Sequence, residues 1–131
     1  MKEDINSRED LDRLVRHFYD FLLADERMEP IFTSVAKIDL ESHFPHLVEF
    51  WHSLIFMTGA YKRNVMDKHL SLHLKYPLQE EHFQIWLNYF YRAVDDLFSG
   101  PRSEDAKSRA KSMALLMQVK IRQMDQGSLL L

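Results

Sequence analysis

The stretch from Pro77 to Pro101 reads PLQEEHFQIWLNYFYRAVDDLFSGP and decides the fold class. Large apolar side chains recur in it at intervals of three and four residues, which is the period of an amphipathic α-helix. These side chains are Phe83, Trp86, Phe90, Val94 and Leu97. Proline opens the stretch, and a Gly-Pro pair closes it. The sequence therefore predicts a helix that begins at Pro77 and ends before Gly100.

The N-terminal part of the chain predicts a second helix and a short helical turn. Ser7 and Asp10 resemble a capping box, and the apolar positions that follow keep the helical period as far as about Asp25. Beyond that point, Pro30 within residues 29–32 is typical of the first position of a helical turn. We expect the turn to be short.

Two further helices are predicted, one on each side of the first. One begins at Ser42 as its cap and runs to about Thr58, with Pro45 tolerated in a first turn that needs no backbone donors. The other begins at Ser103 as its cap and turns one set of apolar side chains inward. This set is Ala106, Ala110, Met113, Met117, Ile121 and Met124.

Composition sets the class of protein. The chain has 131 residues, of which 46% are hydrophobic and 12% aromatic, with only three glycines and four prolines. We therefore predict one all-α domain over residues 1–131, with a frayed tail from about residue 126. A net charge of −3 without a basic run argues against nucleic-acid binding. Without a signal peptide or a membrane-spanning apolar run, a cytoplasmic location is expected.

The histidines leave two kinds of metal site to weigh, and the chain has seven of them. A carboxylate-bridged di-iron bundle needs two Glu-x-x-His motifs, but only Glu49 with His52 supplies one, because Gln79 precedes His82. A haem pocket needs one imidazole on the iron, an apolar slot and a few polar donors opposite. Aromatic residues are abundant, but their periodicity alone equally fits a plain core, so a haem-free interaction or sensor module stays open.

Four short segments resemble the truncated haemoglobins when they are taken in order. They are LVRHFYDF (14–21) with MEPIF (28–32), SHFPHLVEFW (42–51), MDKHLSL (66–72) and HFQIWL (82–87). Together they are most similar to the third group of that family and span roughly residues 7–124. The resemblance implies a shortened, two-over-two helical globin fold around a haem. Since the chain has no cysteine for covalent attachment, haem b is the expected form.

The same resemblance implies a role for particular residues. His69 matches the iron ligand, and His73, one turn later, is the alternative. Tyr19, Trp86 and His43 match the donors on the ligand side. The remaining cofactor-binding positions are Phe18, Phe32, Leu47 and Trp51 around the haem, with Arg63 and His73 near its propionates.

The implied function is the binding of dioxygen or another diatomic ligand. Turnover of nitric oxide or peroxide would be an enzymatic use of the same pocket, as a nitric oxide dioxygenase or a peroxidase-like protein, and would need a separate electron donor. A haem carrier that passes haem on is a further alternative.

Overall fold

The computed structural model describes residues 2–35, 39–58 and 78–125, and every regular element in these ranges is a helix. The all-α prediction is therefore confirmed. The elements are α1 (Arg8–Ala24), η1 (Ile31–Val35), α2 (Leu40–Ile55), α4 (Glu80–Leu97) and α5 (Pro101–Asp125). None of the helices in the described ranges is long and apolar enough to cross a membrane.

The start of α1 is the one that the sequence predicts. The Ser7 hydroxyl accepts a hydrogen bond from the backbone N–H of Asp10 at 3.2 Å, so one of the unpaired donors of the first turn is satisfied. The helix ends at Ala24, one residue before Asp25, which lies in extended conformation. The predicted short turn is present too, because helical conformation at Glu29 and Pro30 continues into η1.

The predicted ends of α2 are both wrong by three residues. Asp39, not Ser42, precedes the first helical residue, and the Ser42 hydroxyl donates to the Asp39 carboxylate at 2.9 Å. Pro45 is therefore the sixth helical residue instead of a first-turn residue. The helix ends at Ile55, before Thr58, because Met57 adopts a positive φ of 58°. A helix cannot continue through a residue with this backbone conformation.

The start of α4 depends on a histidine. Gln79 and His82 form a reciprocal capping box, in which the backbone N–H of Gln79 donates to Nδ1 of His82 at 2.9 Å. The helix therefore begins at Glu80, later than predicted; Pro77 itself lies outside the described residues. The Gly-Pro break after α4 is confirmed, since α5 starts at Pro101.

Ser103 is not the cap of α5, because the carboxylate of Asp4, near the N-terminus, caps this helix. The Asp4 carboxylate accepts the backbone N–H of Arg102 at 2.9 Å, and both the N–H and the hydroxyl of Ser103 at 2.9 and 2.6 Å. Gly100 has a φ of 145°, and a Cβ there would lie 2.6 Å from Asp4 Cγ. Glycine is therefore required where the N-terminal segment meets this corner.

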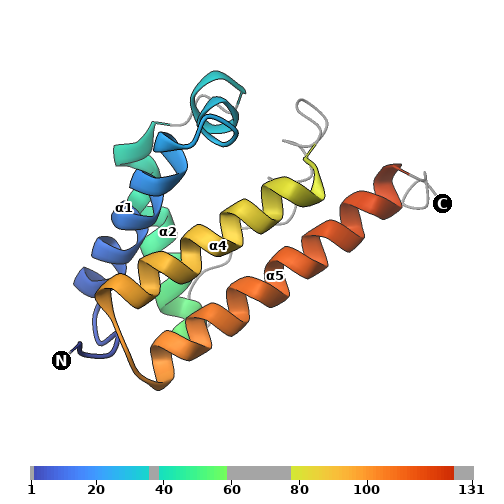
Figure 1. The fold of residues 1–131 in the computed structure, drawn as a ribbon. Coiled ribbons are helices and arrows are strands. Elements are labelled where there is room, and N and C mark those ends of the chain that lie inside the picture. Colours follow the sequence, from blue (N-terminus) through green and yellow to red (C-terminus); the bar gives the residue numbers. More distant parts are fainter. Residues whose placement is uncertain (1, 36–38, 59–77, 126–131) are drawn as a thin grey trace.

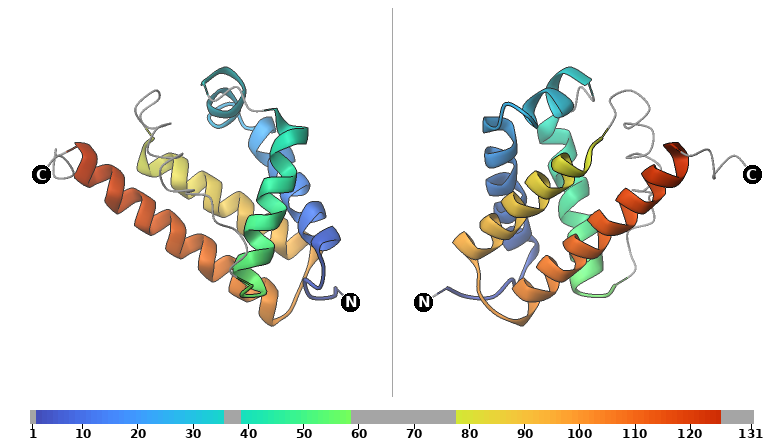
Figure 2. Two further views of the ribbon diagram at one scale, coloured as in Figure 1. Left: turned by 180° about the vertical axis from the view of Figure 1, so that it is seen from behind. Right: turned by 45° about the vertical axis from the view of Figure 1, so that its right-hand side comes forward.

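The helices form two antiparallel pairs, α1 with α2 and α4 with α5 (Figures 1 and 2). The pairs contact each other through α1 against α4 and through α2 against α5, so that one pair crosses the other. The buried core between them includes Leu14, Phe18, Trp51, Phe90 and Ile121. Large apolar side chains also remain at the surface, and in the described residues these are Met57, Leu115, Leu116 and Val119.

Candidate functional site

A buried hydroxyl and an imidazole meet between α1 and α2. Tyr19 is only 6% exposed, and its hydroxyl oxygen lies 3.2 Å from Nε2 of His43. Tyr19 belongs to the buried side of α1, whose apolar residues point toward the core. His43 is the fourth residue of α2, and its ring centroid lies 5.9 Å from that of Tyr19. Two polar side chains are thus brought together within an apolar region.

Aromatic rings surround the Tyr19 side chain. Phe32 of η1 and Phe44 of α2 contact it edge to face, with ring centroids 5.4 and 5.5 Å away. Phe18, the preceding residue of α1, lies 5.7 Å away in the same geometry. Edge-to-face contacts of this kind are favourable and exclude water from the ring edges. In the described part of the chain, the contacts of the Tyr19 side chain are therefore aromatic apart from that with His43.

A second group of rings continues from Phe18 toward α4. Trp86 lies edge to face with Phe18 at 5.5 Å and stacks on Phe90 at 5.8 Å. Trp51 of α2 stacks on Phe90 at 4.8 Å, so both indoles are parallel to the same phenyl ring to within about 22°. Leu47, one helical turn after His43, packs against the same core. Three helices therefore contribute to one aromatic cluster.

Burial controls the protonation of Tyr19. Removal from water disfavours the phenolate and raises the pKa of Tyr19 above its ordinary value. The hydroxyl therefore stays protonated throughout the physiological range. It is a neutral group that can donate one hydrogen bond while accepting another.

Asp25, Arg27 and Tyr89 form a hydrogen-bonded network at the C-terminal end of α1. The Asp25 carboxylate accepts two hydrogen bonds from the Arg27 guanidinium, at 3.1 and 2.8 Å, and one from the Tyr89 hydroxyl at 2.6 Å. The Arg27 guanidinium holds the pKa of Asp25 well below its ordinary range. Tyr89 also stacks on Phe21 at 5.6 Å. The network fixes α1 to α4 one turn beyond Trp86.

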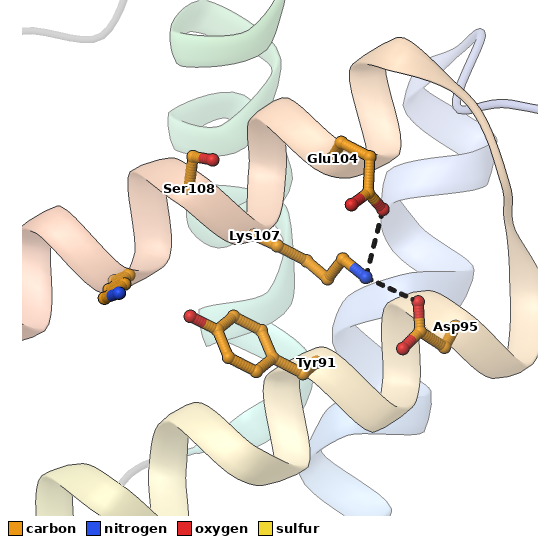
Figure 3. Close-up of a pocket in the computed structure, with 6 residues that line it drawn as sticks. Tyr91, Asp95, Glu104, Lys107 and Ser108 are labelled. Carbon is orange, nitrogen blue, oxygen red and sulfur yellow. Dashed lines mark hydrogen bonds and ion pairs between the residues drawn. The ribbon is translucent and has the colours of Figure 1, made fainter.

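A separate polar pocket of about 260 Å³ lies between α4 and α5 (Figure 3). Lys107 crosses it and forms ion pairs with Asp95 at 2.7 Å and Glu104 at 3.0 Å. Tyr91, Ser108 and Lys111 complete its lining. Lys107 is paired with both carboxylates, so this pocket ties α4 to α5 and, unlike the cluster, is lined by polar side chains.

Comparison with known proteins identifies the family of the chain that carries this cluster. The profile of one protein family, described as Bacterial-like globin, matches residues 2–122. The chain belongs to this family. As a globin it is a haem-binding protein, and the clustered residues lie where three helices of a globin fold meet.

The globin is similar to a group 3 truncated haemoglobin of Campylobacter jejuni. The two sequences are 25% identical over 117 residues, which cover 87% of this chain and 90% of the relative. The crystal structure of a group III truncated haemoglobin from the same organism superposes with a TM-score of 0.80 at 24% identity, over 92% of this chain and 95% of the other. The predicted truncated globin fold, most similar to the third group, is therefore confirmed.

The predicted site residues of this globin fall into two sets. The structure gathers Phe18, Tyr19, Phe32, His43, Leu47, Trp51 and Trp86 in or against the aromatic cluster. His69, His73 and Arg63 lie outside the described residues. Among the residues that the structure does describe, no group of three or more metal-binding side chains occurs. Glu49, considered above for a di-iron site, instead pairs with Arg8 at 2.7 Å.

Sequence reasoning missed several residues around the site of this globin. Phe44 contacts Tyr19 directly, and the only local signal was its place beside His43. Asp25 was interpreted only as a helix end, although it is buried and holds three hydrogen bonds from two side chains. No periodic pattern marks an acidic residue as buried, since its partners Arg27 and Tyr89 come from a loop and a distant helix.

Proposed function

We propose that Tyr19, His43 and Trp86 form the ligand side of a haem pocket that binds dioxygen or another diatomic ligand. The observation that carries the proposal is the buried Tyr19 hydroxyl, 3.2 Å from the imidazole of His43 and enclosed by aromatic rings. A small polar ligand in a dry pocket needs donors of this kind. The likeness to a group 3 truncated haemoglobin supports the same assignment.

The residues present fit a haem. The cluster contains the apolar side chains of Phe18, Phe32, Leu47 and Trp51, which are of the kind that suits a porphyrin face and edge. We propose haem b, because the chain has no cysteine for a thioether bond. In this proposal His69 binds the iron, with His73 as the alternative, and Arg63 and His73 lie near the propionates. The haem would supply an iron centre that binds the ligand and exchanges electrons.

The Tyr19–His43 pair can act as a short relay of hydrogen bonds. With a proton on Nε2, His43 donates to the Tyr19 oxygen, and the hydroxyl proton of Tyr19 is then available for a ligand. The two bonds polarise each other and strengthen the donor. With the opposite tautomer the hydroxyl donates to His43 instead. A ligand therefore receives the hydrogen bond of the Tyr19 hydroxyl when it is a better acceptor than Nε2 of His43.

Strong donors favour chemistry over transport. Each hydrogen bond to a partly charged ligand contributes about 1.5–3 kcal/mol, and each ~1.4 kcal/mol slows ligand release tenfold. Tyr19 together with the indole N–H of Trp86 would then hold a ligand too long for efficient delivery. We therefore propose turnover of nitric oxide or peroxide in this pocket, supported by a separate electron donor. Tyr19 and Trp86 would orient the ligand, and His43 would hold the Tyr19 hydroxyl through their shared hydrogen bond.

The absorption spectrum of the protein during titration with haemin tests the proposal. We expect a sharp Soret band that saturates at one haem per chain in the wild type. His69→Ala should lose or shift this band, whereas His73→Ala should keep it. A loss in His73→Ala alone would move the iron ligand by one turn.

Two results would contradict the proposal. A wild-type protein without a saturable band would be a haem-free helical module. A protein that loses its haem within minutes to a scavenging apoprotein, with or without Tyr19, would be a haem carrier.

A further inference from the structure

Two arginine–glutamate pairs connect α1 to α2, and they differ in what lies beside them. Arg8 pairs with Glu49 at 2.7 Å, and Arg16 pairs with Glu41 at 3.1 Å. Both pairs span the same two antiparallel helices. Glu41 is two residues before His43 in the first turn of α2, whereas Glu49 is almost two turns after it. Only the second pair adjoins the proposed pocket.

Arg16 is half-exposed, but the edges of its guanidinium and one of its faces make contacts. Its Nε donates to Asp12 at 2.9 Å, and its two terminal nitrogens donate to the two Glu41 oxygens at 3.1 and 3.2 Å. The face of the guanidinium covers the Phe44 ring, with Cζ 4.7 Å from its centroid. Phe44 in turn contacts the Tyr19 ring. Such a two-pronged, stacked arrangement requires arginine and cannot be reproduced by a lysine.

The turn that Arg16 holds is weakly joined to the rest of α2. Pro45 has no backbone N–H, so the carbonyl of Glu41 lacks its helical partner. Residues 40–44 are thus connected to the later turns by one bond fewer than an ordinary helix would provide. This first turn carries both His43 and Phe44.

We propose that Arg16 is a positioning residue that keeps the first turn of α2, and with it His43, against Tyr19. Its ion pair with Glu41 and its contact with the Phe44 ring compensate for the backbone hydrogen bond that Pro45 cannot donate. Without it, the turn moves as a unit about Pro45 and separates the imidazole from the hydroxyl. The inference rests on the proposed role of Tyr19 and His43 in the ligand pocket.

The test compares Arg16→Ala with Arg8→Ala in the haem-loaded protein. Arg8→Ala is the matched control, because it removes the same kind of pair from the same two helices. We expect amide hydrogen exchange of His43 and Phe44, the first hydrogen-bonded amides of α2, to accelerate in Arg16→Ala only. Carbon monoxide association should become about three- to tenfold faster in Arg16→Ala and stay within about twofold in Arg8→Ala, because Arg16→Ala removes two exposed ion pairs, to Asp12 and Glu41, and one cation–π contact.

Two further measurements separate positioning from general loosening. Arg16→Lys should fall between the wild type and Arg16→Ala, since it keeps the charge without the planar fork. Raising the salt concentration to about 1 M should speed association in the wild type and leave Arg16→Ala unchanged, because salt screens an exposed pair. Equal exchange and equal association rates in Arg16→Ala and Arg8→Ala would overturn the inference.

The same experiment distinguishes failure of this inference from failure of the proposed function. Tyr19→Phe and His43→Leu are measured in parallel. If neither changes ligand binding, the proposed function fails whatever Arg16 does. If both change it while Arg16→Ala behaves like Arg8→Ala, only the positioning role is wrong.

Discussion

The Asp4 carboxylate and the buried Tyr19 hydroxyl use their hydrogen-bonding capacity in opposite ways. Asp4 accepts four hydrogen bonds, from the backbone N–H groups of Ile5, Arg102 and Ser103 and from the Ser103 hydroxyl. In the part of the chain that the structure describes, the Tyr19 hydroxyl shares a single hydrogen bond, with His43. A saturated group stabilises the fold and has nothing left to offer a ligand. A group with spare capacity contributes less to stability and keeps a donor for chemistry.

The two regions also differ in charge. Burial alone would raise the pKa of Asp4, but the hydrogen bonds from Ser103, Arg102 and Ile5 outweigh it and lower the pKa below its ordinary value. Asp4 is therefore a carboxylate that stabilises a helix end. Tyr19 stays neutral because burial raises its pKa. The corner is thus sensitive to acid, whereas the donor in the pocket is not.

The largest effect on stability is expected at Gly100. Gly100→Ala places a Cβ 2.6 Å from Asp4 Cγ and forces an L-residue to a φ of 145°. Backbone conformations reserved for glycine cost about 1–3 kcal/mol, and the clash adds to this, so we expect a loss of about 3 kcal/mol or more. Urea denaturation measures it. Ser99→Ala, the adjacent position, is the control; equal losses in the two variants would contradict the proposed close approach.

A smaller loss is expected when the cap itself is removed. Asp4→Ala leaves the first N–H groups of α5 without their acceptor, which costs about 2 kcal/mol of unfolding free energy. Asp4→Asn should recover part of this, because an amide oxygen still accepts. The free energy of unfolding at neutral pH checks both. Two variants with wild-type stability would show that the corner does not hold α5.

The contribution of Asp4 should also disappear in acid. Since its pKa is lower in the folded chain, its stabilisation is fully present above the unfolded pKa of about 3.9 and is lost as the pH falls through the folded value. The difference in unfolding free energy between the wild type and Asp4→Ala should therefore narrow below about pH 4. A difference that is as large at pH 3 as at pH 7 would contradict this.

Helices were predictable from sequence where the signal is local. Ser7 and Asp10 lie three residues apart, and the capping interaction they predict is present. Ser103 has the same residue type at a helix start, but Asp4, almost a hundred residues earlier, takes its place. The prediction of Ser42 as a helix cap is wrong, because the helix begins three residues earlier and Asp39 is its N-cap residue. Local chemistry alone cannot tell which of several acceptors tertiary packing brings to a helix end.

The pocket was predictable only in part. The resemblance assigned Tyr19 and His43 to the ligand side of a haem, and the structure shows their side chains in contact. Their role as ligand donors stays a prediction. Phe44, Arg16 and Asp25 were missed, because each also contacts a side chain of another helix to which no spacing in the sequence connects it: Tyr19 for Phe44, Phe44 for Arg16 and Tyr89 for Asp25. The roles of His69, His73 and Arg63 stay predictions.

Dioxygen release and unfolding, both measured on Tyr19→Phe, test the central claim most directly. The substitution removes one oxygen atom from a site with spare hydrogen-bonding capacity. We predict release faster by roughly ten- to a hundredfold, with a change of unfolding free energy no larger than about 1 kcal/mol. Unchanged release together with a stability loss as large as that of Asp4→Ala would show that the Tyr19 hydroxyl belongs to the structure and not to a ligand.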